Sequence, residues 1–237
     1  NFAVLVDQAG YGKTVVMQDV LKDIENKGYD VLAVKADQQL SGLREISDIQ
    51  NRLGFRESPE RVLFRLAQTG RVVVLIDQVD ALSYSLAGDR ETVNIILDFV
   101  SRLRRIPNVK ILISCRLFDY NSDPRIRNIQ CEKQFSITKL SKDEISKVLL
   151  DQGLDLKRLS LATQELLEIP LHLDLFSLIL SSDNIEPNQL IEIDSLQKLY
   201  DSILSHVALQ DDPTAPAKSL RMEVLRQVVS YMKKQQI

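Results

Sequence analysis

The chain has 237 residues, 44% of them hydrophobic and 27% charged, which suits a soluble globular protein with room for one large α/β domain and a smaller helical one. Its formal net charge of −3 gives no indication of bulk binding to nucleic acid or to an anionic membrane. The sequence contains no run of about 18 apolar residues, so it predicts no membrane-spanning helix. The 2 cysteines are too few for a disulfide framework, and the 2 histidines are too few for a histidine-based metal site.

The first half of the sequence alternates between short apolar runs and amphipathic segments. Buried strands are predicted over 2–6, 30–36, 71–77, 109–115 and, more briefly, 133–137. Helices are predicted over 13–26, 43–53, 59–69 and 89–104, with Ser58 as N-cap and Pro59 as first residue of the third. This alternation indicates a parallel sheet with helices on both faces. Such sheets bind ligands beyond the carboxyl ends of their strands.

The character of the sequence changes near residue 141. Ser141 is followed three residues later by Glu144, which is the pattern of a capping box. Further helices are predicted over 158–168, 171–181, 189–208 and 217–237, and no strand pattern occurs after residue 140. We therefore predict an α/β domain over 1–140 and a helical subdomain over 141–237. Because the chain begins with Asn1 and not Met, directly in a strand-like run, we expect it to be a piece of a longer protein; the two cysteines favour a reducing compartment and hence a cytoplasmic location.

The segment "DQAGYGKT" (7–14) follows the first predicted strand and opens the first helix. A phosphate-binding loop needs converging backbone N–H groups, and glycines such as Gly10 and Gly12 where the chain bends. Lys13 supplies a cation for the β- and γ-phosphates, the Thr14 hydroxyl binds Mg²⁺, and the helix dipole adds to the attraction. The predicted nucleotide contacts are Ala9, Gly10, Tyr11, Gly12, Lys13, Thr14 and Val15.

The strict loop motif has glycine where this chain has Asp7. Aspartate is one of the few other residues that tolerate a left-handed backbone, although its charge lies near the phosphates. We expect weakened nucleotide binding at worst. The loop does not select ATP over GTP, and the absence of an Asn/Thr-Lys-x-Asp guanine motif favours ATP.

The third strand ends at Asp77, which we predict holds the Mg²⁺ shell, usually through water. Hydrolysis also requires a group that orients or deprotonates the attacking water. Many related ATPases have a carboxylate directly after the Mg²⁺ acid, but Gln78 stands there. The next acid, Asp80, either serves as the base or caps the following turn.

The fourth strand ends in "ILISCR". Ser114 could hydrogen-bond the nucleophilic water or the γ-phosphate. Arg116 could place a positive fork on the γ-phosphate and so distinguish ATP from ADP, or it could pair with a surface acid such as Asp119 or Asp123. The sequence therefore supports nucleotide binding better than hydrolysis.

These segments, with "FSITKLSKDEISKVL" and "LLEIPLHLDLF", resemble the STAND class of signalling NTPases, the NACHT- and NB-ARC-like branch of the AAA+ ATPases, over most of residues 1–181. The resemblance implies the P-loop NTPase strand order 5-1-4-3-2, followed by a helical lid. It implies that Arg116 is a γ-phosphate sensor and that Pro170 approaches the base and ribose. Glu168 stands where the family often has glycine. The segment 116–129 resembles bacterial members, many of which are associated with defence.

The resemblance implies a switch that binds ATP or ADP with Mg²⁺, hydrolyses ATP slowly and self-associates according to its nucleotide. The sensor and effector domains of such a switch are expected elsewhere in the same polypeptide, and 195–237 could begin a winged-helix region. The alternative is a continuously cycling AAA+-type motor or remodeller, which requires a carboxylate beside Asp77 and an arginine from a neighbour. A small-molecule kinase is a third option, for which we find no acceptor-binding residues.

Overall fold

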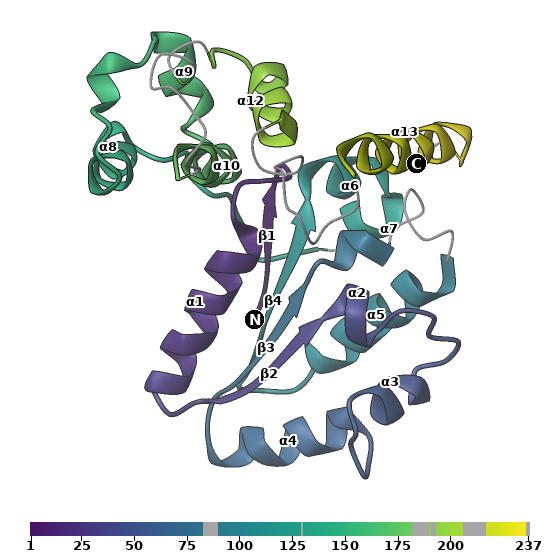
Figure 1. Ribbon diagram of the computed structural model, residues 1–237. Coiled ribbons are helices and arrows are strands. Elements are labelled where there is room, and N and C mark those ends of the chain that lie inside the picture. The colour runs from purple at the N-terminus through teal and green to yellow at the C-terminus, as the bar shows by residue number, and fades with distance from the viewer. Residues whose placement is uncertain (83–89, 129, 182–189, 191–192, 206–216, 236–237) are drawn as a thin grey trace. The chain divides into compact units, whose positions relative to one another are not determined.

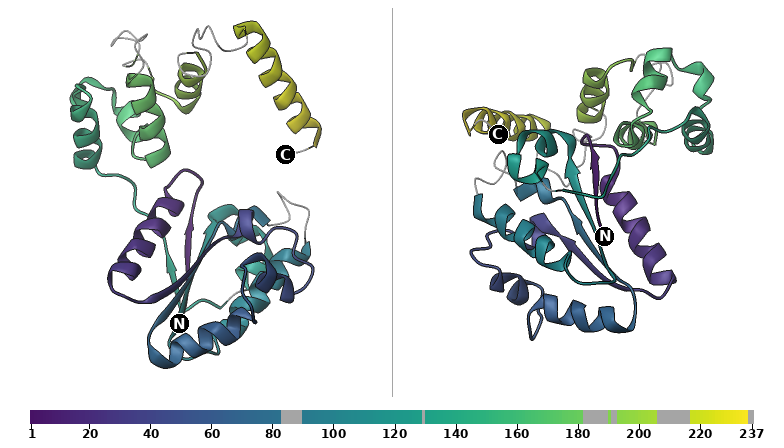
Figure 2. Two further views of the ribbon diagram at one scale, coloured as in Figure 1. Left: turned by 60° about the horizontal axis from the view of Figure 1, so that its bottom comes forward. Right: turned by 180° about the vertical axis from the view of Figure 1, so that it is seen from behind.

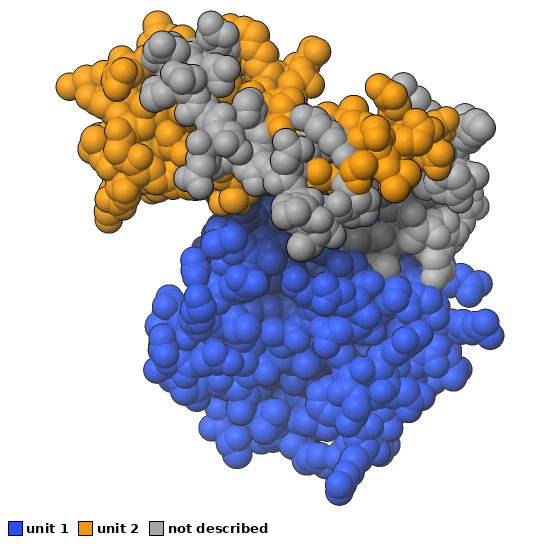
Figure 3. Space-filling view, in the orientation of Figure 1, with its two compact units in different colours: residues 1–137 blue, residues 138–237 orange. Residues whose placement is uncertain are grey.

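The computed structural model describes residues 1–82, 90–128, 130–181, 190, 193–205 and 217–235 (Figure 1). The chain divides into two compact units, residues 1–137 and 138–237 (Figure 3). All the strands of the described residues lie in the first unit, and the described part of the second is built from helices. None of the described helices is long and apolar enough to cross a membrane.

The centre of the first unit is a five-stranded parallel sheet with the order β2-β3-β4-β1-β5. The strands are β1 (Phe2–Asp7), β2 (Asp30–Lys35), β3 (Val72–Asp77), β4 (Val109–Arg116) and β5 (Lys133–Phe135). Read from its other edge, this is the predicted order 5-1-4-3-2, so the predicted α/β class and topology are confirmed. The continuous apolar runs form central strands because both of their faces are covered.

Helices cover the two faces of the sheet separately (Figures 1 and 2). On one face, Leu5 and Leu75 pack with Met17 of α1 (Lys13–Asn26). On the other face, the alternate residues of the same strands join a larger core with α4 (Pro59–Thr69) and α5 (Arg90–Leu103). Val74 and Ile96 in this core are 0% exposed. Apolar cores therefore hold the sheet from both faces, which keeps the carboxyl ends of its strands in fixed positions relative to one another.

The strand register determines which residues meet at that edge. Asp7 lies opposite Arg116 in the β1–β4 pair, and Lys35 lies opposite Asp77 in the β2–β3 pair. Ile76 lies opposite Ile113, which brings the ends of β3 and β4 to the same level. All the side chains that the sequence analysis selected at strand ends therefore gather at one edge of the sheet.

Several short elements differ from the prediction. The helix expected over 43–53 is limited to α3 (Ser47–Arg52), because the Asp48 carboxylate accepts the amide N–H groups of Arg44 and Glu45 and turns the chain before the helix. Helix α4 begins at Pro59 as predicted, but the Ser58 side chain makes no capping hydrogen bond. The remaining short elements were not predicted: α2 (Ala36–Gln39), η1 (Val79–Leu82), α6 (Leu117–Ser122) and α7 (Pro124–Arg127).

The second unit has its own apolar core, in which Ile145, Leu149 and Phe176 are 0% exposed. Its described elements are α8 (Lys142–Asp151), η2 (Leu156–Arg158), α9 (Leu161–Leu166), α10 (Pro170–Leu180), α12 (Leu196–Ile203) and α13 (Lys218–Gln235). Within the predicted helix 189–208, the structure shows α12, while residues 189, 191–192 and 206–208 lie outside the described residues.

The capping box at the start of α8 is confirmed. The Ser141 hydroxyl accepts the Glu144 amide N–H at 3.3 Å, and Glu144 Oε2 accepts the Ser141 amide N–H at 2.7 Å. Each side chain therefore satisfies a backbone donor at a helix end that has no intrahelical acceptor for it.

We predict that Ser141→Ala destabilises the first turn of α8 by about 1 kcal/mol, because the N-cap acceptor is lost. Amide hydrogen exchange over residues 142–149 should then accelerate roughly fivefold. Ser181→Ala is the matched control, since the Ser181 hydroxyl only donates to the carbonyl of Ser177 at an exposed helix end. Equal exchange rates in the two variants would show that the capping box does not stabilise the helix.

Candidate nucleotide-binding site

The loop between β1 and α1 has the backbone of a phosphate cradle. Gly10 and Gly12 have φ of 85° and 86°, in the left-handed region that favours glycine. Helix α1 starts directly after Gly12, whose carbonyl accepts the Val16 amide at 3.0 Å. Because Gly12 has no side chain that could cap the helix, the first-turn N–H groups remain suited to an anion.

Lys13 folds back over this loop. Its Nζ donates to the carbonyl oxygens of Asp7 at 2.8 Å and Gln8 at 2.7 Å. The pKa of Lys13 is lowered, chiefly because burial disfavours the charged ammonium, while the nearby carboxylate of Asp80 works in the opposite direction. A phosphate in the loop would supply the counter-charge that this partly buried cation lacks.

Thr14 and Asp77 meet although 63 positions separate them in the sequence. Thr14 Oγ1 donates to Asp77 Oδ2 at 2.9 Å, and the Asp77 side chain is buried. A hydroxyl and a carboxylate are oxygen ligands that suit Mg²⁺, which needs only one or two carboxylates when phosphates supply further ligands. The residues present therefore fit a Mg²⁺ ion bound with a nucleotide. Across the described part of the chain, including this site, no group of three or more His, Cys, Asp or Glu could by itself hold a metal ion.

Ser114 has a different position from the one the sequence suggested. It is 0% exposed, its hydroxyl donates to Asp77 Oδ1, and it accepts the backbone N–H of Gln78 at 2.9 Å. Its single hydrogen is thus directed at Asp77, away from any water or γ-phosphate. The β3–β4 pairing explains this, because Ser114 follows Ile113 and lies beside the end of β3. Ser114 therefore holds the Asp77 carboxylate in place through this hydrogen bond.

Arg116 and Asp80 form an ion pair, with 3.0 Å between Nε and Oδ2. The Asp80 side chain is 3% exposed and that of Arg116 is 45% exposed. Burial raises the pKa of Asp80, and the charge of Arg116 partly offsets this. The partner of Arg116 is therefore neither of the surface acids suggested by the sequence, and the ion pair buries Asp80 instead of presenting it to an attacking water. Asp123 pairs with Arg125.

Gln78, which directly follows Asp77, contacts the carboxylate of Asp37, an acid that was not predicted for the site from the sequence. Its backbone has φ of 60°, which is unusual for a residue with a side chain. Its amide lies 3.5 Å from Thr14 Oγ1 on one side. In the amide orientation that satisfies both sides, its nitrogen donates to Asp37 Oδ2 at 2.9 Å and Oδ1 at 3.2 Å. Asp37 was detectable as an acid just after the second strand, at the same edge of the sheet.

Both carboxylate oxygens of Asp7 accept backbone N–H groups. Oδ1 accepts the Gln8 amide and Oδ2 accepts the Ile137 amide, both at 2.8 Å. Among the described non-glycine residues, φ is positive only at Gln78 and Asn108, so Asp7 keeps an ordinary strand backbone. A left-handed conformation is therefore not the reason that aspartate is accepted here. The Asp7 side chain therefore links the start of the loop to Ile137, the last residue of the first unit, by a hydrogen bond.

A cavity of about 550 Å³ opens beside the loop, within the size range of small-molecule sites. Its lining includes Gln8, Ala9 and Arg116, together with residues of α6.

The remaining residues predicted from the sequence differ in their surroundings. Tyr11 is half-buried, and Val15 is 59% exposed on α1. Pro170 is the first residue of α10 in the second unit, so its role toward the base stays a prediction. Glu168 pairs with Lys139 at 2.7 Å.

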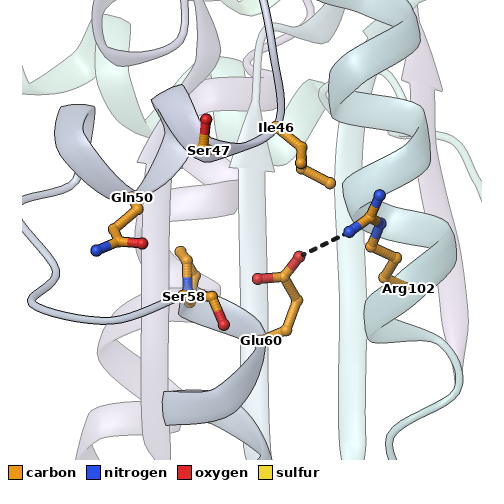
Figure 4. Close-up of a pocket in the computed structure, with 7 residues that line it drawn as sticks. Ile46, Ser47, Gln50, Ser58, Glu60 and Arg102 are labelled. Carbon is orange, nitrogen blue, oxygen red and sulfur yellow. Dashed lines mark ion pairs between the residues drawn. The ribbon is translucent and has the colours of Figure 1, made fainter.

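Another cavity, of about 350 Å³, lies between α3, α4 and α5 (Figure 4). Glu60 and Arg102 point toward each other there, 3.9 Å apart. None of the residues predicted for the nucleotide site lines this cavity. The two cavities are therefore separate features of the first unit.

Comparison with solved structures shows the fold of the P-loop, or Walker-type, ATPases. The Walker-type ATPase PABY2304 of Pyrococcus abyssi aligns with a TM-score of 0.54 and 13% identity, over 98% of this chain and 72% of that chain. The structure of C. elegans PCH-2 aligns with a TM-score of 0.48 and 17% identity, over 86% of this chain and 61% of that chain. The structure of the E. coli MS115-1 HORMA:CdnC:Trip13 complex aligns with a TM-score of 0.46 and 18% identity, over 95% of this chain and 73% of that chain. No family model and no curated protein matches the chain.

We predict that Asp7→Gly, which restores the strict loop motif, lowers the free energy of unfolding by about 2 kcal/mol, because two backbone N–H groups lose their acceptor. ATP affinity should change by less than about threefold, or ~0.7 kcal/mol. Asp7→Asn keeps one acceptor oxygen and should lose roughly 1 kcal/mol. Urea unfolding and titration calorimetry measure both quantities. Unchanged stability with ATP binding at least about tenfold tighter would show that the carboxylate faces the phosphates.

Proposed function

We propose that this chain is the nucleotide-binding module of a STAND-type signalling switch, which binds ATP or ADP with Mg²⁺ and hydrolyses ATP slowly. The observation that carries the proposal is the hydrogen bond from Thr14 to Asp77, which joins the glycine loop to the end of β3. An α/β fold alone would not imply a nucleotide. Here the loop, the cation and the two oxygen ligands converge at one edge of the sheet.

In this proposal the residues of the loop bind the phosphates. Lys13 exchanges its two carbonyl acceptors for phosphate oxygens, and the first-turn N–H groups of α1 donate to the same anion. Thr14 and Asp77 hold Mg²⁺, which neutralises charge on the β- and γ-phosphates. Ser114 keeps the Asp77 carboxylate in place from behind.

The ion pair of Arg116 with Asp80 offers a way to distinguish the two nucleotides. A γ-phosphate near Arg116 competes with Asp80 for the guanidinium, whereas ADP leaves the ion pair intact. The buried Asp80 then loses its partner, which changes the surroundings of η1. Such a contact, made in one nucleotide state only, is what a ligand-driven switch requires.

Slow turnover follows from the residue after the Mg²⁺ acid. Gln78 is not a general base, and Asp80 is buried in its ion pair. We propose that the ATP-bound state self-associates, and that sensor and effector domains of the same polypeptide lie outside this chain. A continuously cycling AAA+-type ATPase is the alternative. The observation that favours it is the carboxylate of Asp37 beside Gln78.

We predict that Lys13→Met weakens ATP binding about 100-fold, because two charge-assisted hydrogen bonds to phosphate are lost. Asp77→Asn should weaken Mg²⁺-ATP binding at least about tenfold and leave binding in EDTA unchanged. Calorimetric titration with ATP, ADP and GTP measures these affinities. Lys27→Met, at the other end of α1 in an exposed pair with Asp23, is the control. Wild-type affinity in Lys13→Met would refute the proposed site.

A further inference from the structure

Asp37 lies at the edge of the sheet where the nucleotide site is assembled. It occupies the first turn of α2, which follows β2 directly and packs against η1. In the β2–β3 pair, Lys35 lies opposite Asp77, so the chain beyond Lys35 runs beside the corner formed by Asp77 and Gln78. An acid in this position belongs to the same strand-end cluster as the Mg²⁺ ligands.

A continuous chain of polar contacts joins Asp37 to those ligands. When the Gln78 nitrogen donates to the Asp37 carboxylate at 2.9 Å, the other end of the amide lies about 3.5 Å from Thr14 Oγ1, whose own hydrogen is donated to Asp77 Oδ2. The backbone of Gln78 is held by the hydrogen bond from its N–H to the Ser114 hydroxyl. The unusual φ of Gln78 thus orients an amide that contacts an acid on one side and the Mg²⁺ ligand on the other.

The other acids at this edge are engaged in hydrogen bonds or buried from water. Asp7 accepts two backbone N–H groups, and both oxygens of Asp77 accept hydroxyl hydrogens. Asp80 is in its ion pair and 2% exposed, and Asp119 is 4% exposed. Asp37 is only half-buried, so water can reach its carboxylate.

We propose that Asp37 is the general base of slow ATP hydrolysis and that Gln78 is its positioning residue, so that the carboxylate expected after Asp77 is supplied from α2 instead. The inference rests on the proposed function. In the step, the oxygen of water bonds to the γ-phosphorus as the bond from the γ-phosphorus to the β–γ bridging oxygen breaks. The proton of the water passes to the Asp37 carboxylate, and ADP and phosphate are the products.

The test compares Asp37→Asn with the wild type in two assays, ATP affinity and single-turnover hydrolysis with Mg²⁺. We expect affinity to change by less than about threefold and the hydrolysis rate to fall at least about 100-fold, the lower end of what a general base contributes. Asp30→Asn is the matched control, since Asp30 is exposed at the start of β2, the strand that leads into α2 and Asp37. It should hydrolyse ATP at the wild-type rate.

A second variant separates catalysis from structural support. Adding Gln78→Glu to Asp37→Asn restores a carboxylate directly after Asp77, and we expect it to recover at least about tenfold of the lost rate. Undiminished hydrolysis in Asp37→Asn, or binding of ATP by the wild type without any hydrolysis, would overturn the inference and leave the nucleotide site standing. Failure of the wild type to bind ATP would overturn the proposed function and the inference together.

Discussion

The hydrogen bond between Thr14 and Asp77 is the contact on which the organisation of the site depends. The two residues come from the start of α1 and the end of β3, and β1 and β3 are separated in the sheet by β4. The contact therefore forms only because the parallel register brings the strand ends to one level and α1 packs across the sheet through Met17. Ser114 on the intervening strand then fixes the other oxygen of Asp77.

Two residues, Asp7 and Gln78, depart from the usual nucleotide-site pattern, and hydrogen bonds at the strand edge accommodate both. Asp7 replaces a glycine, but both oxygens of its carboxylate are occupied by the backbone N–H groups of Gln8 and Ile137. Gln78 replaces a carboxylate, and its amide contacts the carboxylate of Asp37, on the short helix α2 that follows β2. Under the proposed function, these substitutions leave the binding groups intact and move the acid that hydrolysis needs.

The sequence predicted the sheet and the loop well because continuous apolar runs and paired glycines are local signals; α1, for example, spans Lys13–Asn26 as expected. It could not predict the partners of Arg116 and Ser114, which depend on strand register and burial. Short helices such as α2 have too few residues to show a helical period, so Asp37 was overlooked. A solved structure supports the P-loop NTPase fold, whereas the STAND branch is a proposal based on the motifs of this chain.

The central claim is that this strand edge holds an adenine nucleotide which is turned over slowly. The most direct measurement is to denature the protein as isolated from cells and to identify and quantify the released nucleotide. We predict ADP at close to one molecule per chain, because the loop, Lys13 and Asp77 together favour retention. Release of a guanine nucleotide, or an empty protein that also fails to bind added ATP with Mg²⁺, would contradict the account.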